Sequence, residues 1–238
     1  MSSLYLIRHG QAGTRQSYDA LSDLGHRQAY RLGQYLAGQQ IQFKAFITGC
    51  LRRQRQTAEE VRRAYREAGV PVPEIVSEPA WNEFDMTAVF SEFAPLLSAD
   101  DPQFKQDYEA LLRELEKEGS PLHHAWTDCD TEAMLAWMAG RYECRTESWQ
   151  AFRRRVLGFR SALAAWQADD TVAVFTSAVP IAIWVASAFG LDDGHIMRLG
   201  AVMYNSAVTT MQQHDGGLML FTFNGVPHLD APDLRTFR

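Results

Sequence analysis

The stretch Leu4–Gln11 most constrains what this chain can fold into, because a short apolar run there ends in Arg8, His9 and Gly10. Residues 4–7 have the length and composition of a buried strand in a parallel or mixed sheet. Gly10 allows the backbone to turn directly after the strand and lets a ligand approach closely. Open α/β sheets bind ligands at the carboxyl ends of their strands. An arginine and a histidine at such an end therefore predict a binding site.

Arg8 and His9 suit one kind of chemistry. The guanidinium of Arg8 is a planar fork of donors that matches a phosphate or a carboxylate. The ring of His9 carries a nucleophilic nitrogen and has an ordinary pKa near ~6.5. Together they indicate phosphoryl transfer through a histidine. The alternative that this tripeptide alone leaves open is an arginine in a surface ion pair beside a histidine that completes a turn.

Length and charge limit the classes of partner. A chain of 238 residues can form one large α/β domain or two small ones. The net charge of -6 does not favour nucleic acid as a partner, so an anionic substrate needs a local cluster of arginines. No segment has the length of a membrane span and no signal segment opens the chain, so we expect no membrane partner. Three cysteines without metal-ligand spacing are typical of the reducing cytoplasm.

Strand patterns alternate with helix patterns along the chain. Ser22 is placed to cap a first helix, and Ser148 is placed to cap a long helix that reaches Trp166. A hairpin signal at 214–217 joins the last two strands. The expected strands cover 4–7, 43–48, 74–77, 171–176, 197–212 (interrupted) and 218–223. This alternation predicts an α/β fold, namely a three-layer α/β/α sandwich with a mostly parallel mixed sheet.

Residues from about Met86 to Arg145 differ from this pattern. Asp101 and Pro102 form a cap and first turn for one helix, and a second apolar helix follows through Met134. We expect a single domain over 1–238, with a helical cap insertion at about 86–146 that lies over the site.

Five stretches, in order, resemble motifs of the histidine phosphatase superfamily, the phosphoglycerate-mutase-like enzymes. The resemblance covers roughly the whole chain except the insertion, and the combination is far more specific than any one motif. The stretches are Leu6–Gln11, Leu21–Gly25 with Gln28-Ala29, Leu51–Ala58, Trp81–Phe84, and Thr146–Ser148 with Arg155-Val156.

The resemblance implies a role for each matching residue. His9 corresponds to the family's nucleophile, and Arg8 and Arg53 to its phosphate clamp. Glu83 corresponds to the acidic proton donor, and Gln11 is implied to join phosphate binding. The implied cycle uses no metal and no other cofactor.

The sequence departs from the family after the strand at 171–176. The family places a second histidine and a glycine there, whereas this chain has Ser177 and Ala178. A serine donates one neutral hydrogen bond, and loss of a preorganised donor costs about a hundredfold or more in rate. We expect Ser177 to bind phosphate, with Gly10 and His228 at the edge of the pocket. Replacement of the missing histidine by His228 is the less favoured alternative.

These residues predict a phosphomonoester hydrolase that forms a phosphohistidine at His9. Its expected substrate is a phosphorylated small metabolite or a phosphoprotein, and its product is inorganic phosphate. One alternative is a phosphoglycerate-type mutase, although the stretch after Gln11 lacks the asparagine and the Gly-Trp pair associated with mutases. The other is a catalytically degenerate module that binds phosphate esters. Retention of His9 and Glu83 argues against that alternative, because binding alone needs neither a nucleophile nor a proton donor.

Overall fold

A computed structural model describes the protein over residues 2–13, 19–123, 125–163, 166–167, 169–214 and 217–237. The chain divides into two compact units. The first consists of the described residues up to Glu83 together with those from Arg155 onwards, and the second consists of 84–154. The predicted insertion at about 86–146 falls within the second unit. That the chain forms a single domain, and that the insertion lies over the site, stay predictions.

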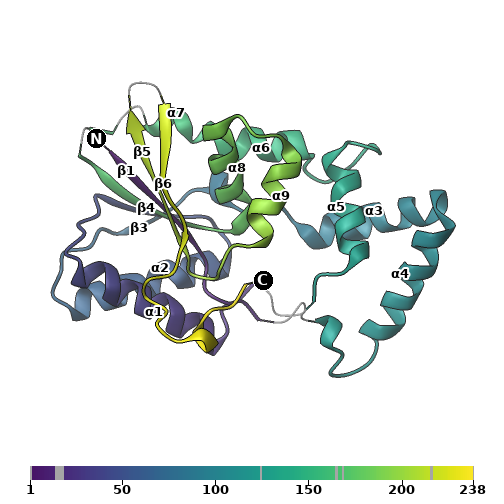
Figure 1. The fold of residues 1–238 in the computed structure, drawn as a ribbon, viewed down its shortest axis with the longest axis horizontal. Helices are drawn as coiled ribbons and strands as arrows, with labels where there is room; N and C mark the ends of the chain where they lie inside the picture. The colour runs from purple at the N-terminus through teal and green to yellow at the C-terminus, as the bar shows by residue number, and fades with distance from the viewer. Residues whose placement is uncertain are drawn as a thin grey trace. The chain divides into compact units, whose positions relative to one another are not determined.

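The first unit contains the sheet. Its strands are β1 (Ser3–Arg8), β2 (Ala45–Thr48), β3 (Ile75–Ser77), β4 (Thr171–Thr176), β5 (Val208–His214) and β6 (Gly217–Gly225). Among the described residues they form one six-stranded sheet in the order β3-β2-β4-β1-β5-β6 (Figure 1). The first four of these strands run parallel, and β5 and β6 continue the sheet in antiparallel pairing. The predicted α/β fold with a mostly parallel mixed sheet is confirmed.

Helices cover both faces of this sheet (Figure 1). On one face lie α1 (Asp23–Gly38) and α2 (Arg52–Glu67), and on the other lies α8 (Ala178–Phe189), against which α9 (Asp193–Ala201) packs. As predicted, Ser22 caps α1, since its Oγ accepts a hydrogen bond from the Gly25 N–H at 3.1 Å. Gly190 ends α8 in the left-handed conformation, with a φ of 64°.

The core between the sheet and the first two helices is rich in aromatic residues. Phe46 and Phe175 meet edge to face with their ring centroids 5.1 Å apart, and Tyr65 packs on Phe46 in the same manner. All three side chains are completely buried. Gly33 of α1 lets α2 come close, because a side chain at this position would meet the backbone of Val61 at 2.7 Å. The packing of α1, α2 and the sheet holds the strand ends in fixed positions.

Sheet register brings the ends of β1 and β4 together. Arg8 pairs with Thr176 as the last residue pair of the two strands. The N–H of His9 then donates to the carbonyl oxygen of Thr176 at 2.9 Å. His9 and Ser177 therefore leave the sheet from neighbouring strands at the same edge, where α/β proteins place ligands.

The second unit has an aromatic core of its own. Its helices are α3 (Met86–Asp100), α4 (Pro102–Leu115), α5 (Asp128–Met138) and the first part of α6 (Trp149–Gly158). Phe84 stands 4.8 Å from Trp137 and 5.6 Å from Phe152, measured between ring centroids. Trp137 also meets Trp149 edge to face at 5.3 Å. As predicted, Asp101 caps α4.

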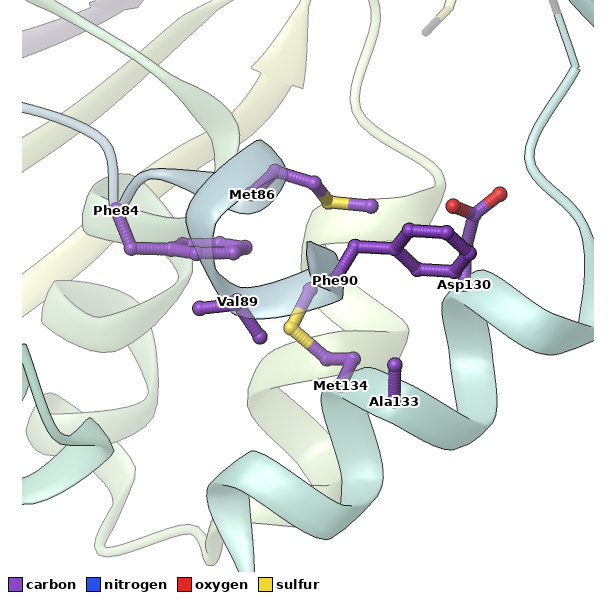
Figure 2. Close-up of a pocket in the computed structure, with 7 residues that line it drawn as sticks. All are labelled: Phe84, Met86, Val89, Phe90, Asp130, Ala133 and Met134. Carbon is purple, nitrogen blue, oxygen red and sulfur yellow. The ribbon is translucent and has the colours of Figure 1, made fainter. Parts of the chain in front are cut away.

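A small pocket lies between α3 and α5 within this unit (Figure 2). Its lining is apolar except for Asp130, whose Oδ2 accepts hydrogen bonds from the N–H and the Oγ1 of Thr127, both at 2.8 Å. The lining residues are Phe84, Met86, Val89, Phe90, Asp130, Ala133 and Met134. Because none of these described residues is cationic, the pocket is not suited to a phosphate group.

One predicted strand begins later than expected. The apolar residues near Met197 predict a strand over 197–212, but Asp193–Ala201 form α9 and the strand begins at Val208. Asp192 caps this helix by accepting a hydrogen bond from the His195 N–H at 3.1 Å. This local cap outweighs the strand preference of the apolar residues. The hairpin turn predicted at 214–217 includes residues 215 and 216, which lie outside the described residues.

The long helix predicted after Ser148 is divided. Ser148 does begin it, since its Oγ accepts from the Ala151 N–H at 3.3 Å, but α6 ends at Gly158 and α7 covers only Arg160–Leu163. Glycine is a poor helix former, which explains a break at this position. Trp166 lies outside any helix.

Candidate active site

His9 follows β1 directly and is buried, with 1% of its surface exposed. Its Nδ1 lies 2.7 Å from the carbonyl oxygen of Gly10. That oxygen can only accept, so Nδ1 carries the ring proton. Nε2 is then the atom with the lone pair, and it accepts a hydrogen bond from Nε of Arg53 at 3.2 Å. The structure thus presents Nε2 as the nucleophilic atom.

The surroundings of His9 keep its ring neutral. Burial lowers the pKa of His9 well below its ordinary value, and the positive charges of Arg53 and Arg8 lower it further. The hydrogen bond to Gly10 acts in the opposite direction and is a smaller effect. A neutral imidazole retains the lone pair that attack on phosphorus requires.

Arg8 is held by the loop between α9 and β5. Its Nη1 donates to the carbonyl oxygen of Met203, and its N–H donates to that of Ala207 at 3.0 Å. In the same loop, the N–H of Ser206 donates to the carbonyl oxygen of His9 at 3.1 Å. These bonds fix a buried guanidinium beside the nucleophile, where it can bind an anion.

Arg53 lies in the first turn of α2 and is 7% exposed. While its Nε faces His9, its Nη1 lies 3.5 Å from Oδ1 of Asp19. The same carboxylate oxygen accepts the N–H of Arg52 at 3.1 Å. A negatively charged group therefore already occupies the N-terminus of α2, which is a position that also favours phosphate.

The turn that follows His9 is packed closely. The N–H of Gly10 donates to Oγ1 of Thr57 at 3.1 Å, and that hydroxyl donates to the carbonyl oxygen of Arg53 at 2.7 Å. A side chain at position 10 would overlap the carbonyl group of Gly25. Thr57 therefore connects the turn that carries the nucleophile with the helix that carries Arg53.

Gln11 is tied to the first helix. Its Oε1 accepts a hydrogen bond from Oγ of Ser22 at 2.7 Å, and its N–H donates to Oε1 of Gln28 at 2.8 Å. The side-chain oxygen thus supports the N-terminus of α1. A role of Gln11 in phosphate binding stays a prediction.

Glu83 lies at the N-terminus of α8, where its Oε2 accepts the N–H of Val179 at 3.2 Å. The positive end of the helix dipole favours a carboxylate at this place. Nη1 of Arg155 anchors the preceding loop by donating to three carbonyl oxygens at 3.0, 3.1 and 3.0 Å, those of Pro79, Ala80 and Asn82. Glu83 thus directly follows a loop that these hydrogen bonds hold in place.

Ser177 is the N-cap residue of the same helix and is 1% exposed. Its Oγ accepts a hydrogen bond from Nε2 of Gln54 at 2.9 Å. The same nitrogen donates to the carbonyl oxygen of Trp81 at 3.2 Å. Gln54 is the residue after Arg53, so it connects the arginine helix with Ser177 and with the loop of Glu83.

His228 reaches the nucleophile indirectly. Its Nε2 lies 2.7 Å from Oγ of Ser206, the residue whose N–H binds the carbonyl oxygen of His9. Burial, and then the charge of Arg31, lower the pKa of His228 to about 4. The prediction that His228 lies at the pocket edge is not tested by these contacts.

The structure thus brings Arg8, His9 and Arg53 into one cluster, and Glu83 and Ser177 to the N-terminus of α8. Sequence reasoning missed Gln54, Thr57 and Asp19. Gln54 had a detectable signal, because it falls on the apolar stripe that Leu51, Ala58, Val61 and Tyr65 define. A polar residue on a buried stripe needs hydrogen-bond partners. Thr57 binds two backbone groups, and Asp19 binds the Arg52 N–H and the Arg53 side chain, and no local pattern identifies these contacts.

Metal-binding clusters and membrane-spanning helices are both absent from the described residues. Within the described part of the chain, no group of three or more histidine, cysteine, aspartate or glutamate side chains is arranged to hold a metal ion. Among the helices of the described residues, none combines the length and apolar character that crossing a membrane requires.

Solved structures with a similar fold share 16–20% sequence identity with this chain, which shows the fold alone. Bacillus stearothermophilus YhfR is 20% identical with a TM-score of 0.65, over 97% of this chain and 100% of that chain. Phosphoserine phosphatase from Entamoeba histolytica is 17% identical with a TM-score of 0.61, over 96% and 100%. Phosphoglycerate mutase from Bacillus anthracis is 16% identical with a TM-score of 0.60, over 96% and 95%.

No curated protein matches the chain. The sequence does match the family described as histidine phosphatase superfamily (branch 1), over residues 4–119 and 103–225. These ranges include every strand of the sheet except the first residue of β1, and they contain the cluster of Arg8, His9 and Arg53. The chain therefore belongs to the histidine phosphatase superfamily.

Proposed function

We propose that the protein hydrolyses phosphomonoesters through a phosphohistidine at His9. The observation that carries this proposal is the hydrogen bonding of the His9 ring, with Nδ1 on the Gly10 carbonyl oxygen and Nε2 facing a guanidinium. This arrangement offers one unprotonated nitrogen next to a group that binds phosphate. Membership in the histidine phosphatase superfamily supports the same chemistry.

In the first step, Nε2 of His9 attacks the phosphorus atom, and the bond to the ester oxygen breaks. Arg8 and Arg53 bind the non-bridging oxygens and stabilise their charge. For this, Nε of Arg53 leaves the lone pair of Nε2 and turns to the phosphoryl group. Glu83 gives a proton to the leaving oxygen, which departs as an alcohol.

In the second step, Glu83 takes a proton from water, and the resulting hydroxide attacks the phosphohistidine. The bond between phosphorus and Nε2 breaks, which restores His9 and releases inorganic phosphate. Ser177, which stands in the place of the family's second histidine, donates a neutral hydrogen bond to the phosphoryl group. We propose that this cycle runs without a metal ion.

The proposed substrates are a phosphorylated small metabolite or a phosphoprotein. Related folds include a phosphoserine phosphatase and a mycobacterial glucosyl-3-phosphoglycerate phosphatase, the latter solved with inorganic phosphate. These relatives support a phosphate ester as the substrate class. We propose that the helical segment at about 86–146 sets the specificity within that class.

The experiment is turnover of p-nitrophenyl phosphate, with rapid quenching at alkaline pH and mass spectrometry of the peptide that contains His9. We expect one phosphoryl group on His9 during turnover, and no activity from His9→Ala. Full activity of His9→Ala would refute the mechanism. If phosphate binds but neither turnover nor phosphohistidine is found, the protein is the binding module that the loss of the second histidine at Ser177 leaves open.

The role of Glu83 has a separate test. If it protonates the leaving group, Glu83→Gln should slow phosphorylation of His9 strongly for alkyl phosphates and weakly for nitrophenyl phosphate, whose leaving group needs no proton. Single-turnover measurements isolate this step from dephosphorylation. Equal losses for both esters would contradict the assignment.

A further inference from the structure

Gln54 is completely buried, and all the polar atoms of its side chain are used. Its Oε1 accepts the N–H of Leu51 at 3.4 Å. Its Nε2 donates to the carbonyl oxygen of Trp81 at 3.2 Å and to Oγ of Ser177 at 2.9 Å. An amide nitrogen has two hydrogens, and here each has an acceptor.

The partners of Gln54 determine which way round its amide lies. The carbonyl oxygen of Trp81 can only accept, so it must face Nε2, and the N–H of Leu51 can only donate, so it must face Oε1. Oγ of Ser177 is bound by the same Nε2 and must therefore accept. As a consequence, the single hydroxyl hydrogen of Ser177 cannot point at Gln54.

The Ser177 hydroxyl hydrogen is thus left for another acceptor. Among the residues that the structure describes, Oγ of Ser177 has Gln54 as its hydrogen-bond partner and no further acceptor. A hydroxyl that already accepts one hydrogen bond is a stronger donor of the next. Ser177 lies beside the end of β1, because the N–H of His9 binds the carbonyl oxygen of the preceding Thr176.

The backbone before α2 leaves space for the Gln54 amide. A Cβ atom at Gly49 would overlap Oε1 of Gln54 and would stand 2.9 Å from the carbonyl oxygen of Trp81. A residue with a side chain at this position would push the amide away from Ser177. The contact between Gln54 and Ser177 therefore depends on a glycine that follows β2.

We infer that Gln54 is a positioning residue, which directs the hydroxyl hydrogen of Ser177 toward a phosphoryl group bound at Arg8, His9 and Arg53. Gln54 and Ser177 together then supply one oriented, neutral donor at the end of β4. This inference rests on the proposed function, because it assigns the phosphoryl group to that cluster.

A double-mutant cycle tests the inference with inorganic phosphate as the probe. Titration calorimetry measures phosphate affinity for the wild type, Gln54→Met, Ser177→Ala and the double variant. Each single change should weaken phosphate binding about tenfold, as expected for one hydrogen bond to an anion. In the Ser177→Ala background, Gln54→Met should cause little further loss, because the hydroxyl it directs is gone.

Additive losses, or no loss from Gln54→Met alone, would overturn the inference. Gln56→Met is the matched control, since Gln56 lies on the same helix and its Oε1 accepts the Leu21 N–H at 2.9 Å. It should leave phosphate affinity unchanged. If Gln54→Met does not fold, Gln54→Leu replaces it in the cycle. Leucine has no amide to donate to Oγ of Ser177 and adds no charge, so the same pattern of losses is expected.

The double-mutant cycle distinguishes failure of this inference from failure of the proposed function. Phosphate titration uses the resting protein and requires no turnover. If the ester is not hydrolysed but the losses are coupled, the proposed function fails and the positioning role of Gln54 stands. If the ester is hydrolysed through His9 and the losses are additive, the inference alone fails. A wild type that does not bind millimolar phosphate would overturn the inference.

Discussion

A buried histidine near the nucleophile should make the stability of the protein depend on pH. His228 is 7% exposed, and its Nδ1 has no hydrogen-bond partner among the described residues. Burial, followed by the charge of Arg31, lowers its pKa to about 4 in the folded state. In the unfolded chain a histidine binds a proton near pH ~6.5. Stability is therefore unaffected by His228 above that pH, and it falls as the pH decreases toward about 4.

The size of the effect follows from these two values. A pH of 5 is about 1.5 units below the pKa of the unfolded histidine, and each unit corresponds to about 1.4 kcal/mol. His228 therefore lowers the free energy of unfolding by about 2 kcal/mol between pH 7 and pH 5. His228→Gln cannot be protonated and keeps an amide near Oγ of Ser206. We expect this variant to lose about 2 kcal/mol less stability over the same interval. Urea denaturation at both pH values measures the difference.

Comparison with the wild type isolates this histidine. His9 also has a lowered pKa, but it contributes to both proteins and cancels. If His228→Gln loses as much stability as the wild type between pH 7 and pH 5, the reasoning is refuted.

Three further outcomes are expected. Gly49→Ala should destabilise the protein by about 1–3 kcal/mol in urea denaturation through overpacking, whereas Gly38→Ala, with no atom within 4 Å of the added Cβ, should not. Thr57→Val should cost about 1–3 kcal/mol, because it leaves the Gly10 N–H without its acceptor, and Thr57→Ser should retain most of the stability. The lowered pKa of His9 predicts that kcat/KM has no acid limb near pH 6.5, and a limb at that pH in a pH–rate profile would contradict the neutral nucleophile.

The parts of the fold that local rules determine could be predicted from the sequence. β1, β4 and the α1 cap at Ser22 lie where the apolar runs and the capping residue predict them. The error at Met197 has a physical cause. An apolar segment of that length suits a strand or a helix equally well, and the hydrogen bond from His195 to Asp192 selects the helix.

The candidate site likewise has residues that the sequence pattern identifies and contacts that it does not. Arg8 and His9 could be found because they follow a recognisable strand. Gln54 could be noticed as a polar residue on the apolar stripe of its helix, but its partners could not be identified, because Trp81 and Ser177 are 27 and 123 positions away along the chain. A hydrogen bond over such separations depends on the sheet order, which the sequence pattern does not contain.

The aromatic core of the second unit has a consequence for how this protein could diversify. Phe84 and Phe152, near the two ends of the segment 84–154, pack against each other with ring centroids 5.6 Å apart. The two ends of the segment thus lie close together, and a segment with neighbouring ends can be inserted into another domain without disturbing it. Recombination at these junctions could exchange the whole segment and leave Arg8, His9 and Arg53 in place. Laboratory chimaeras joined at these two positions would test the proposal that this segment sets substrate specificity.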